Sequence, residues 1–345
     1  MFSTIFLQIC RGLGDNKKYA IGSFITGAVT VILNVIFIVV FHLGAYGMLG
    51  ATLISNIICV IYLFVSKKIH KYIKIKKYDK KLLKEIIKYS IPLVPNMLSW
   101  WIVDTSDRTI ISLVLGIAQN GIYSAANKFT NVFASLYSVF NLTWTESAAI
   151  NINSPDKDNF FSKILDVTLR FFVTLAIGII AVMPFVFPIL INEKFAEAYN
   201  QIPILMVGSI FNILVSFIGS IYVAKKITKE IAKTSIFAAI INIAINFILI
   251  KWIGLYAASI STVVSYFAMF IYRYIDSKKY VKLSVNKKLV ISMVILLDIS
   301  ICTYYVGNKT LQLVSAFIVT IYAIVINRTS VEFILQSVKN KIVKK

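Results

Sequence analysis

Residues 90–146 read SIPLVPNMLSWWIVDTSDRTIISLVLGIAQNGIYSAANKFTNVFASLYSVFNLTWTE, and this stretch decides the fold of the chain. It contains two apolar segments, each long enough for a helix that crosses the ~30 Å hydrocarbon core of a bilayer. The two segments together hold four charged residues, Asp104, Asp107, Arg108 and Lys128. A charge at the centre of a membrane helix costs about 2.5–3.5 kcal/mol on insertion scales, so we expect these four to have a function.

The rest of the chain is also strongly apolar. Of its 345 residues 58% are hydrophobic and 15% charged, whereas a soluble domain averages about 25% charged residues. Apolar segments long enough to span a bilayer predict ten membrane helices, at residues 19–41, 45–65, 90–115, 121–146, 164–190, 201–224, 234–252, 254–274, 289–306 and 311–326. These segments lack the alternation of strands, and backbone polar groups must be paired within lipid. The sequence therefore predicts an all-α polytopic membrane protein.

The positive charges follow the predicted topology. One alternating set of loops and termini, with residues 273–288 counted among the loops, holds 30 of the 36 lysines and arginines; the opposite set holds 3. Cytoplasmic loops carry such an excess, so we expect both termini and the basic loops to face the cytoplasm of a cell membrane. The net charge of +21 is then explained by topology, and no nucleic-acid partner is expected.

Few residues are suited to metal binding or to hydrolysis. The three cysteines have no paired spacing, and the two histidines, His42 and His70, lie in predicted loops. Outer loops are short, which disfavours a membrane-embedded glycan polymerase or acyltransferase. We therefore expect neither a cofactor nor an enzymatic activity.

An internal repeat relates residues 23–67 to residues 235–278. Ser23 and Asn34 lie eleven residues apart in the first copy, and Ser235 and Asn246 have the same spacing in the second. A glycine and a serine follow in each copy, again eleven residues apart: Gly44 and Ser55, then Gly254 and Ser265. Four predicted spans precede only the second copy. This predicts the last ten helices of a fourteen-helix, two-lobe protein, an architecture that several transporters build from repeats.

The repeat and the charges divide the chain into four parts. Residues 1–65 are expected to be the remnant of an N-terminal lobe with two membrane helices, and residues 66–89 a basic amphipathic linker. The linker either lies on the anionic inner leaflet or is simply solvated. Residues 90–274 are expected to form a six-helix C-terminal lobe, and residues 275–345 two additional membrane helices and a basic tail.

Several short motifs carry a resemblance to a known family. They are YSIPLVPN at residues 89–96, SDR at 106–108, LG at 115–116, GIYSAANK at 121–128, QICRGLG at 8–14, Tyr19 and GAYG at 44–47. These motifs resemble the polysaccharide or oligosaccharide (O-antigen type) flippases. That family belongs to the superfamily that includes multidrug and toxin extrusion transporters and the lipid II flippase. The sequence departs from the family pattern by lacking the first four helices, so it resembles an N-terminally truncated member.

The resemblance implies two six-helix lobes around a central cavity. It also implies that the protein moves undecaprenyl-pyrophosphate-linked oligosaccharide across the cytoplasmic membrane for lipopolysaccharide or capsule synthesis. The implied partners are this polyprenyl-linked substrate, membrane lipids, and a missing N-terminal half or other polysaccharide assembly proteins. Two alternatives stay open: an ion-coupled multidrug or toxin exporter of the same superfamily, and an inactive or partner-dependent fragment.

Two polar stripes on adjacent predicted helices form the candidate substrate site. Helical spacing places one set of residues on a single face of the first helix: Asn96, Trp100, Asp104, Asp107 and Arg108. The second helix contributes Asn127, Lys128 and Asn131. Such stripes are expected to face protein or water rather than lipid.

The roles expected within the site follow from charge. Arg108 suits bidentate contact with pyrophosphate oxygens, and Lys128 adds a point charge. Asp104 or Asp107 would carry a coupling proton or sodium ion, and Trp100 would either stack on a sugar ring or only pack. A competing interpretation is that the charges neutralise one another and fix helix packing.

Other polar residues within spans have simpler expected roles. Asp166 and Arg170 are four residues apart and should pair with each other. The asparagines are expected to hydrogen-bond between helices, at about 0.6 kcal/mol each; they are Asn34, Asn212, Asn242 and Asn246. Asp298 stands alone in its span and has no assigned role.

The predicted topology can be tested by cysteine labelling. In a background without the three native cysteines, Lys194→Cys should react with a membrane-impermeant maleimide added to intact cells. Lys229→Cys should react only after permeabilisation, because its loop is expected in the cytoplasm. Labelling of the second variant alone in intact cells would reverse the orientation.

Overall fold

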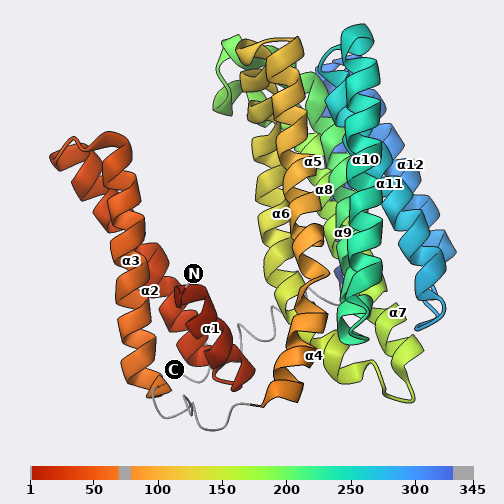
Figure 1. Cartoon of the computed structure of the whole chain (residues 1–345). Coiled ribbons are helices and arrows are strands. Elements are labelled where there is room, and N and C mark those ends of the chain that lie inside the picture. Colours follow the sequence, from red (N-terminus) through yellow and green to blue (C-terminus); the bar gives the residue numbers. More distant parts are fainter. Residues whose placement is uncertain (1, 70–78, 329–345) are drawn as a thin grey trace, which may run out of the picture. The chain divides into compact units, whose positions relative to one another are not determined.

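The computed structural model describes residues 2–69 and 79–328, and all regular secondary structure in these residues is helical (Figure 1). The helices are α1 (Phe2–Gly12), α2 (Asn16–Val35), α3 (Gly44–Lys67), α4 (Lys80–Ser90), α5 (Leu93–Val114), α6 (Ile117–Asn151), α7 (Lys157–Thr168), α8 (Thr174–Leu190), α9 (Ile202–Ala224), α10 (Thr228–Ile253), α11 (Tyr256–Ser277), α12 (Lys287–Val306) and α13 (Lys309–Ile326). Two π-helical segments, η1 (Ile36–Val40) and η4 (Leu169–Val173), and the 3₁₀ segment η5 (Glu193–Gln201) complete them. Every predicted span is helical, which confirms the predicted fold class.

Within residues 2–69 and 79–328, seven helical segments are long and apolar enough to cross a membrane by length and composition alone. They are Asn16–Val40, Gly44–Lys67, Lys157–Leu190, Glu193–Ala224, Thr228–Ile253, Lys287–Val306 and Lys309–Ile326. The predicted spans in α5, α6 and α11 are not among them. These three helices carry many of the polar residues discussed below, and their membrane crossing stays a prediction.

The chain divides into two compact units, and the first ends at Leu83. Its helices α1, α2 and α3 pack around a small core that includes Cys10, Cys59 and Leu63. Asp15 accepts a hydrogen bond from the Lys18 amide at the start of α2 and pairs with the Lys67 ammonium at 2.7 Å. These two contacts hold the pKa of Asp15 below its ordinary value, with the Lys67 hydrogen bond the larger cause.

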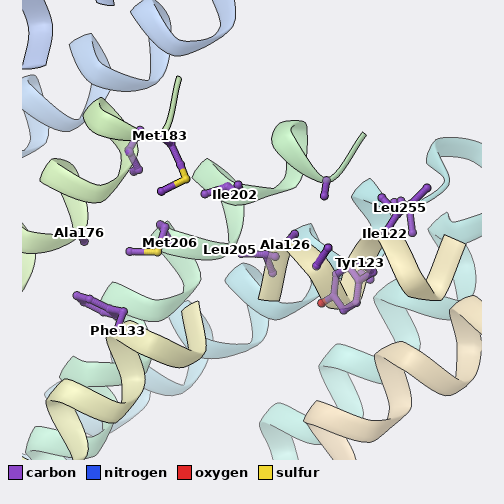
Figure 2. Packing of buried hydrophobic residues seen from close by; sticks show 14 of the residues in the cluster. Ile122, Tyr123, Ala126, Phe133, Ala176, Met183, Ile202, Leu205, Met206 and Leu255 are labelled. Atoms are coloured by element: carbon purple, nitrogen blue, oxygen red, sulfur yellow. The ribbon is translucent and has the colours of Figure 1, made fainter. Parts of the chain in front are cut away.

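The second unit, from Lys84 onward, is a helical bundle. In it α10 packs on α5 and α11, α9 packs on α6 and α11, and α8 supports α12 and α13. Apolar side chains from α6, α8 and α9 meet in its largest core cluster (Figure 2). Phe133, Met206 and Ile180, three members of this cluster, are completely buried.

One long helix of this bundle is interrupted between α7 and α8. The π-helical segment η4 widens the turn there, and Arg170 within it donates to the Asp166 carboxylate at 2.8 Å. The predicted pairing of these two residues is therefore confirmed. Arg170 also donates to the Ile326 carbonyl at 3.4 Å, which fastens α13 against this point.

The two copies of the repeat form helical hairpins, and each has a glycine with a positive φ in the connection between its helices. In the first, Gly44 begins α3 with a φ of 52°, and in the second Gly254 precedes α11 with a φ of 58°. Both angles lie in the region that L side chains rarely adopt, so glycine meets the same requirement in each copy.

One residue is placed differently from the expectation. The loop count assigned Arg273 to a cytoplasmic loop, whereas the structure buries it inside α11 with 2% of its surface exposed. Its guanidinium donates to the Thr234 hydroxyl at 2.9 Å, the Val215 carbonyl at 3.0 Å and the Ser235 hydroxyl at 3.2 Å. Neutral oxygens on α9 and α10 thus satisfy a buried charge that hydropathy alone assigns to water.

The turn glycines give a stability prediction. Gly254→Ala should lower the thermal unfolding midpoint, because a strained backbone of this kind costs about 1–3 kcal/mol. Gly178→Ala, in α8, is the matched control: a Cβ there meets nothing within 4 Å and the helix gains propensity. Equal midpoints for both variants would contradict the strain argument.

Candidate functional site

A polar pocket of about 220 Å³ lies inside the second unit, between α5, α6, α9 and α11. Its lining residues are Trp100, Val103, Asp104 and Asp107 from α5, Tyr123, Asn127, Thr130, Asn131 and Ala134 from α6, Leu205, Ser209 and Asn212 from α9, and Thr262 and Tyr266 from α11. Oxygen and amide groups dominate this lining, although the surrounding helices are mostly apolar.

Five predicted site residues line this pocket: Trp100, Asp104, Asp107, Asn127 and Asn131. Asn96 lies directly behind the wall, where its side-chain oxygen accepts from the Trp100 indole at 3.2 Å. Arg108 and Lys128 are not among the lining residues. The two cations of the predicted site therefore lie on α5 and α6, which both contribute to the pocket, but they do not form its wall.

Asp107 is the most constrained residue of the site, with 3% of its surface exposed. Its Oδ1 accepts from Asn246 Nδ2 at 2.7 Å, and its Oδ2 accepts from the hydroxyls of Thr262 at 2.8 Å and Tyr123 at 3.0 Å. No lysine or arginine of the described residues lies within ion-pair distance of this carboxylate. Three neutral donors from α6, α10 and α11 hold it, and hydrogen bonds to a carboxylate are among the stronger ones.

A second amide links the same helices beside Asp107. Asn242 on α10 accepts from the Ser106 hydroxyl at 3.2 Å and donates to the Ser261 hydroxyl at 3.2 Å. The predicted interhelical role is confirmed for Asn242 and Asn246. The side-chain oxygen of Asn246 is itself buried without a hydrogen-bond partner.

The charged pair beside the pocket is loose. Arg108 Nη2 lies 3.7 Å from Asp104 Oδ1, and the two side chains are 38% and 70% exposed. Exposed pairs of this kind contribute about 0–1 kcal/mol. The Arg108 Nε is buried without a hydrogen-bond partner, so this side chain has unused donor capacity. Lys128 is exposed on α6.

A chain of hydrogen bonds holds Trp100 in place. The Asn96 oxygen that accepts from the indole also accepts from the Ser235 hydroxyl at 2.6 Å, and Ser235 in turn accepts from Arg273 at 3.2 Å. Trp100 packs on Tyr266 with ring centroids 5.6 Å apart. The aromatic wall of the pocket is thus fixed from behind by the buried arginine.

Six polar lining residues were not predicted as site residues: Tyr123, Thr130, Ser209, Asn212, Thr262 and Tyr266. Asn212 was noted, but only as an interhelical hydrogen-bonding group. Ser209 and Asn212 lie three residues apart and Thr262 and Tyr266 four apart, so a search for helical spacing in α9 and α11 would have found them.

The lining suits a hydrogen-bonding ligand that is neutral or cationic. It offers two carboxylates, three amides, three hydroxyls of serine and threonine and two tyrosines beside an indole, and no lysine or arginine. Flat aromatic faces next to amides and carboxylates can hold sugar rings, whose faces are apolar and whose edges carry hydroxyls.

The two carboxylates should respond differently to mutation. Asp107→Ala removes the acceptor for two buried donors, on Tyr123 and Asn246, and for the half-buried Thr262 hydroxyl. Each buried group left unpaired costs about 1–3 kcal/mol, so the variant should strongly lower the thermal unfolding midpoint in detergent. Asp104→Ala, on the same helix but exposed, should leave the midpoint nearly unchanged. Similar midpoints for the two variants would show that the Asp107 hydrogen bonds do not stabilise the bundle.

The chain can also be compared with known proteins. Residues 1–144 match the family described as polysaccharide biosynthesis protein. A search of curated proteins finds no match to the sequence.

Solved structures with a similar fold are membrane transporters. A MATE transporter in the bent conformation is 14% identical with a TM-score of 0.68, covering 85% of this chain and 67% of its own. A MOP superfamily transporter from Pyrococcus furiosus is 14% identical with a TM-score of 0.67, covering 80% and 66%. The lipid II flippase MurJ in an inward closed conformation is 18% identical with a TM-score of 0.61, covering 96% and 72%.

The chain thus spans about two thirds of the length of the MATE structures it matches. The resemblance inferred from the sequence motifs is confirmed by both kinds of comparison. The chain is therefore similar to the polysaccharide biosynthesis protein family over residues 1–144, and it has the multi-helix membrane fold that MATE transporters and the lipid II flippase share.

Proposed function

We propose that this protein is a flippase that moves polyprenyl-pyrophosphate-linked oligosaccharide across the cytoplasmic membrane for surface polysaccharide synthesis. The observation that carries the proposal is the polar, aromatic-walled pocket inside a bundle of apolar helices. The family match over residues 1–144 and the similarity of the fold to a lipid II flippase support it.

The oligosaccharide is the part of the substrate that suits the pocket. Trp100 and Tyr266 offer aromatic faces for sugar rings, and Asn127, Asn131 and Asn212 offer amides for sugar hydroxyls. Because every lining group is neutral or acidic at neutral pH, the pyrophosphate would be held elsewhere.

Arg108 and Lys128 are the proposed pyrophosphate ligands, just outside the pocket wall. Arg108 follows Asp104 by one helical turn, and Lys128 adjoins Asn127, so both cations lie next to lining residues. The loose Asp104–Arg108 pair is weak enough for a doubly charged pyrophosphate to displace the carboxylate. Binding would then free Asp104 as substrate arrives.

Transport of this kind requires relocation of the head group rather than covalent chemistry. Substrate binding would favour one arrangement of the helical units over another and so expose the sugar to the opposite side. Asp104 is the better candidate for a coupling cation, because it is exposed while both oxygens of Asp107 already accept hydrogen bonds. The polyprenyl tail would stay in the lipid.

One observation favours a second candidate, an ion-coupled exporter of cationic compounds. Asp104 and Asp107 line the pocket and no cation does, which is the polarity that a positively charged ligand requires. In that case Arg108 would serve only to hold Asp104.

A complementation assay tests the pyrophosphate role. In the native host lacking its own copy, Arg108→Ala and Lys128→Ala should reduce surface polysaccharide about 10–100-fold at unchanged protein level, since a hydrogen bond to a charged group contributes about 1.5–3 kcal/mol. Lys194→Ala, in η5, is the control and should restore normal polysaccharide. Normal polysaccharide with Arg108→Ala would exclude the proposed role.

The charge-swapped double variant Asp104→Arg/Arg108→Asp separates binding from packing. It keeps an ion pair on α5, so a purely structural pair predicts normal polysaccharide. Loss of polysaccharide at normal protein level supports a phosphate ligand at residue 108. Loss of resistance to cationic compounds with normal polysaccharide would instead favour the exporter.

A further inference from the structure

A second pocket, independent of the transport proposal, lies on the other side of α9. Its volume is about 510 Å³, and it separates α12 from α9 and α11. α12 packs mainly against α8 and α13, which leaves its opposite face along this space. Apart from the Tyr274 hydroxyl and the Lys287 ammonium, the side chains that line the pocket are hydrocarbon or thioether.

The pocket is oriented along the helices, with its polar residues at one end. Lys287 begins α12, and Leu297, the deepest lining residue on this helix, is ten residues further on. A rise of 1.5 Å per residue makes this about 15 Å, half of the ~30 Å hydrocarbon core. Tyr274 near the end of α11 and Ile218 near the end of α9 lie at the same end as Lys287. The pocket therefore has the depth of one bilayer leaflet.

The helix wall opposite α12 is shaped by the π-helical segment. Leu169 and Val173, the two ends of η4, line the pocket, and both also line a small extension toward the interior with Ile210 and Leu214. A widened π turn is uncommon and is often associated with functional sites. Here it lies toward the lysine-rich end, where Asn327, just past α13, donates to the Arg170 carbonyl at 3.3 Å and to the Thr174 hydroxyl at 3.2 Å.

The surroundings of the open end are strongly basic. The connection from α11 to α12 and the first turn of α12 carry five lysines and no acidic residue: Lys278, Lys279, Lys282, Lys287 and Lys288. Lys279 is paired with Asp276 at 2.5 Å. Lys287 has no carboxylate of the described residues within ion-pair distance, and Lys278 lies over the Tyr274 ring at 5.0 Å. Asp276 and Asp158, which accepts from the Lys282 amide at 3.0 Å, offset part of this charge, and a negatively charged head group at this end would still face a net positive one.

We propose that this pocket binds one acyl chain of an anionic phospholipid, such as a phosphatidylglycerol, from the leaflet at the lysine-rich end. The chain occupies the apolar space between α9, α11 and α12, and the phosphate contacts Lys287. Three observations support this proposal. The pocket is as deep as one leaflet, its lining is almost entirely apolar, and Lys287 lies at its open end. The bound lipid fastens α12 to the bundle on the face that protein side chains leave open.

The test uses the full chain, purified in detergent from membranes that contain both phosphatidylglycerol and zwitterionic phosphatidylethanolamine. Co-purified lipids are quantified by mass spectrometry. The wild-type protein should retain phosphatidylglycerol at several times its share of the bulk membrane. Val294→Trp fills the pocket and should abolish that enrichment. Ile295→Trp is the matched control, because Ile295 is similarly exposed on α12 but does not line the pocket.

The head-group contact is tested separately. Lys287→Ala should keep the amount of bound lipid but lose the preference for phosphatidylglycerol, whereas Lys288→Ala should keep both. Thermal unfolding of the delipidated variants checks that each is folded, and added phosphatidylglycerol should raise the midpoint only where the pocket is open. Unchanged enrichment in Val294→Trp would overturn the proposal. So would retention of undecaprenyl phosphate in place of phosphatidylglycerol, since the pocket would then hold a substrate tail.

Discussion

The second unit depends on the burial of one carboxylate. Asp107 cannot be surrounded by hydrocarbon without donors, and the nearest donors lie on three other helices, in Tyr123, Asn246 and Thr262. The Asp107 carboxylate can accept these three hydrogen bonds only if α6, α10 and α11 all approach α5 at the level of residue 107. The polar pocket lies where these helices meet, so the residues that stabilise the bundle also form one wall of the proposed binding site.

The sequence predicted the helices well because a bilayer permits few alternatives. Apolar segments without alternation have no other stable conformation in lipid, and the ten predicted segments are helical in the part of the chain that the structure describes, although only seven segments there are long and apolar enough to cross a membrane. Five of the residues predicted for the substrate site also line one pocket, for a simple reason. Trp100, Asp104 and Asp107 on α5, with Asn127 and Asn131 on α6, follow helical spacing, which is visible in one dimension.

Partners that are distant in the sequence could not be predicted in this way. Thr262 contacts Asp107 from 155 positions away, and tyrosine and threonine are too common in membrane helices to single out. Arg273 was misplaced for a related reason: hydropathy assigns an arginine to water, and only the structure shows the hydroxyl and carbonyl oxygens that replace water around it.

The two pockets differ in polarity, so they suit chemically different ligands. The polar pocket combines carboxylates with aromatic rings, while the apolar pocket has a lysine at its mouth. A ligand with a glycan and a ligand with a fatty chain and a phosphate would therefore not compete for the same residues. In this arrangement α9 contributes one face to each pocket, through Asn212 and Leu214.

The hydrogen-bond chain from Arg273 through Ser235 and Asn96 to Trp100 has a mechanical consequence. It crosses from α11 to α10 to α5, and Arg273 also contacts α9 through the Val215 carbonyl. If any of these four helices slid along its neighbour, the guanidinium of Arg273 or the side-chain amide of Asn96 would lose a hydrogen-bond partner. Shear between them is therefore costly, and the four helices should move as one rigid block, with angular changes confined to the segments at its edges.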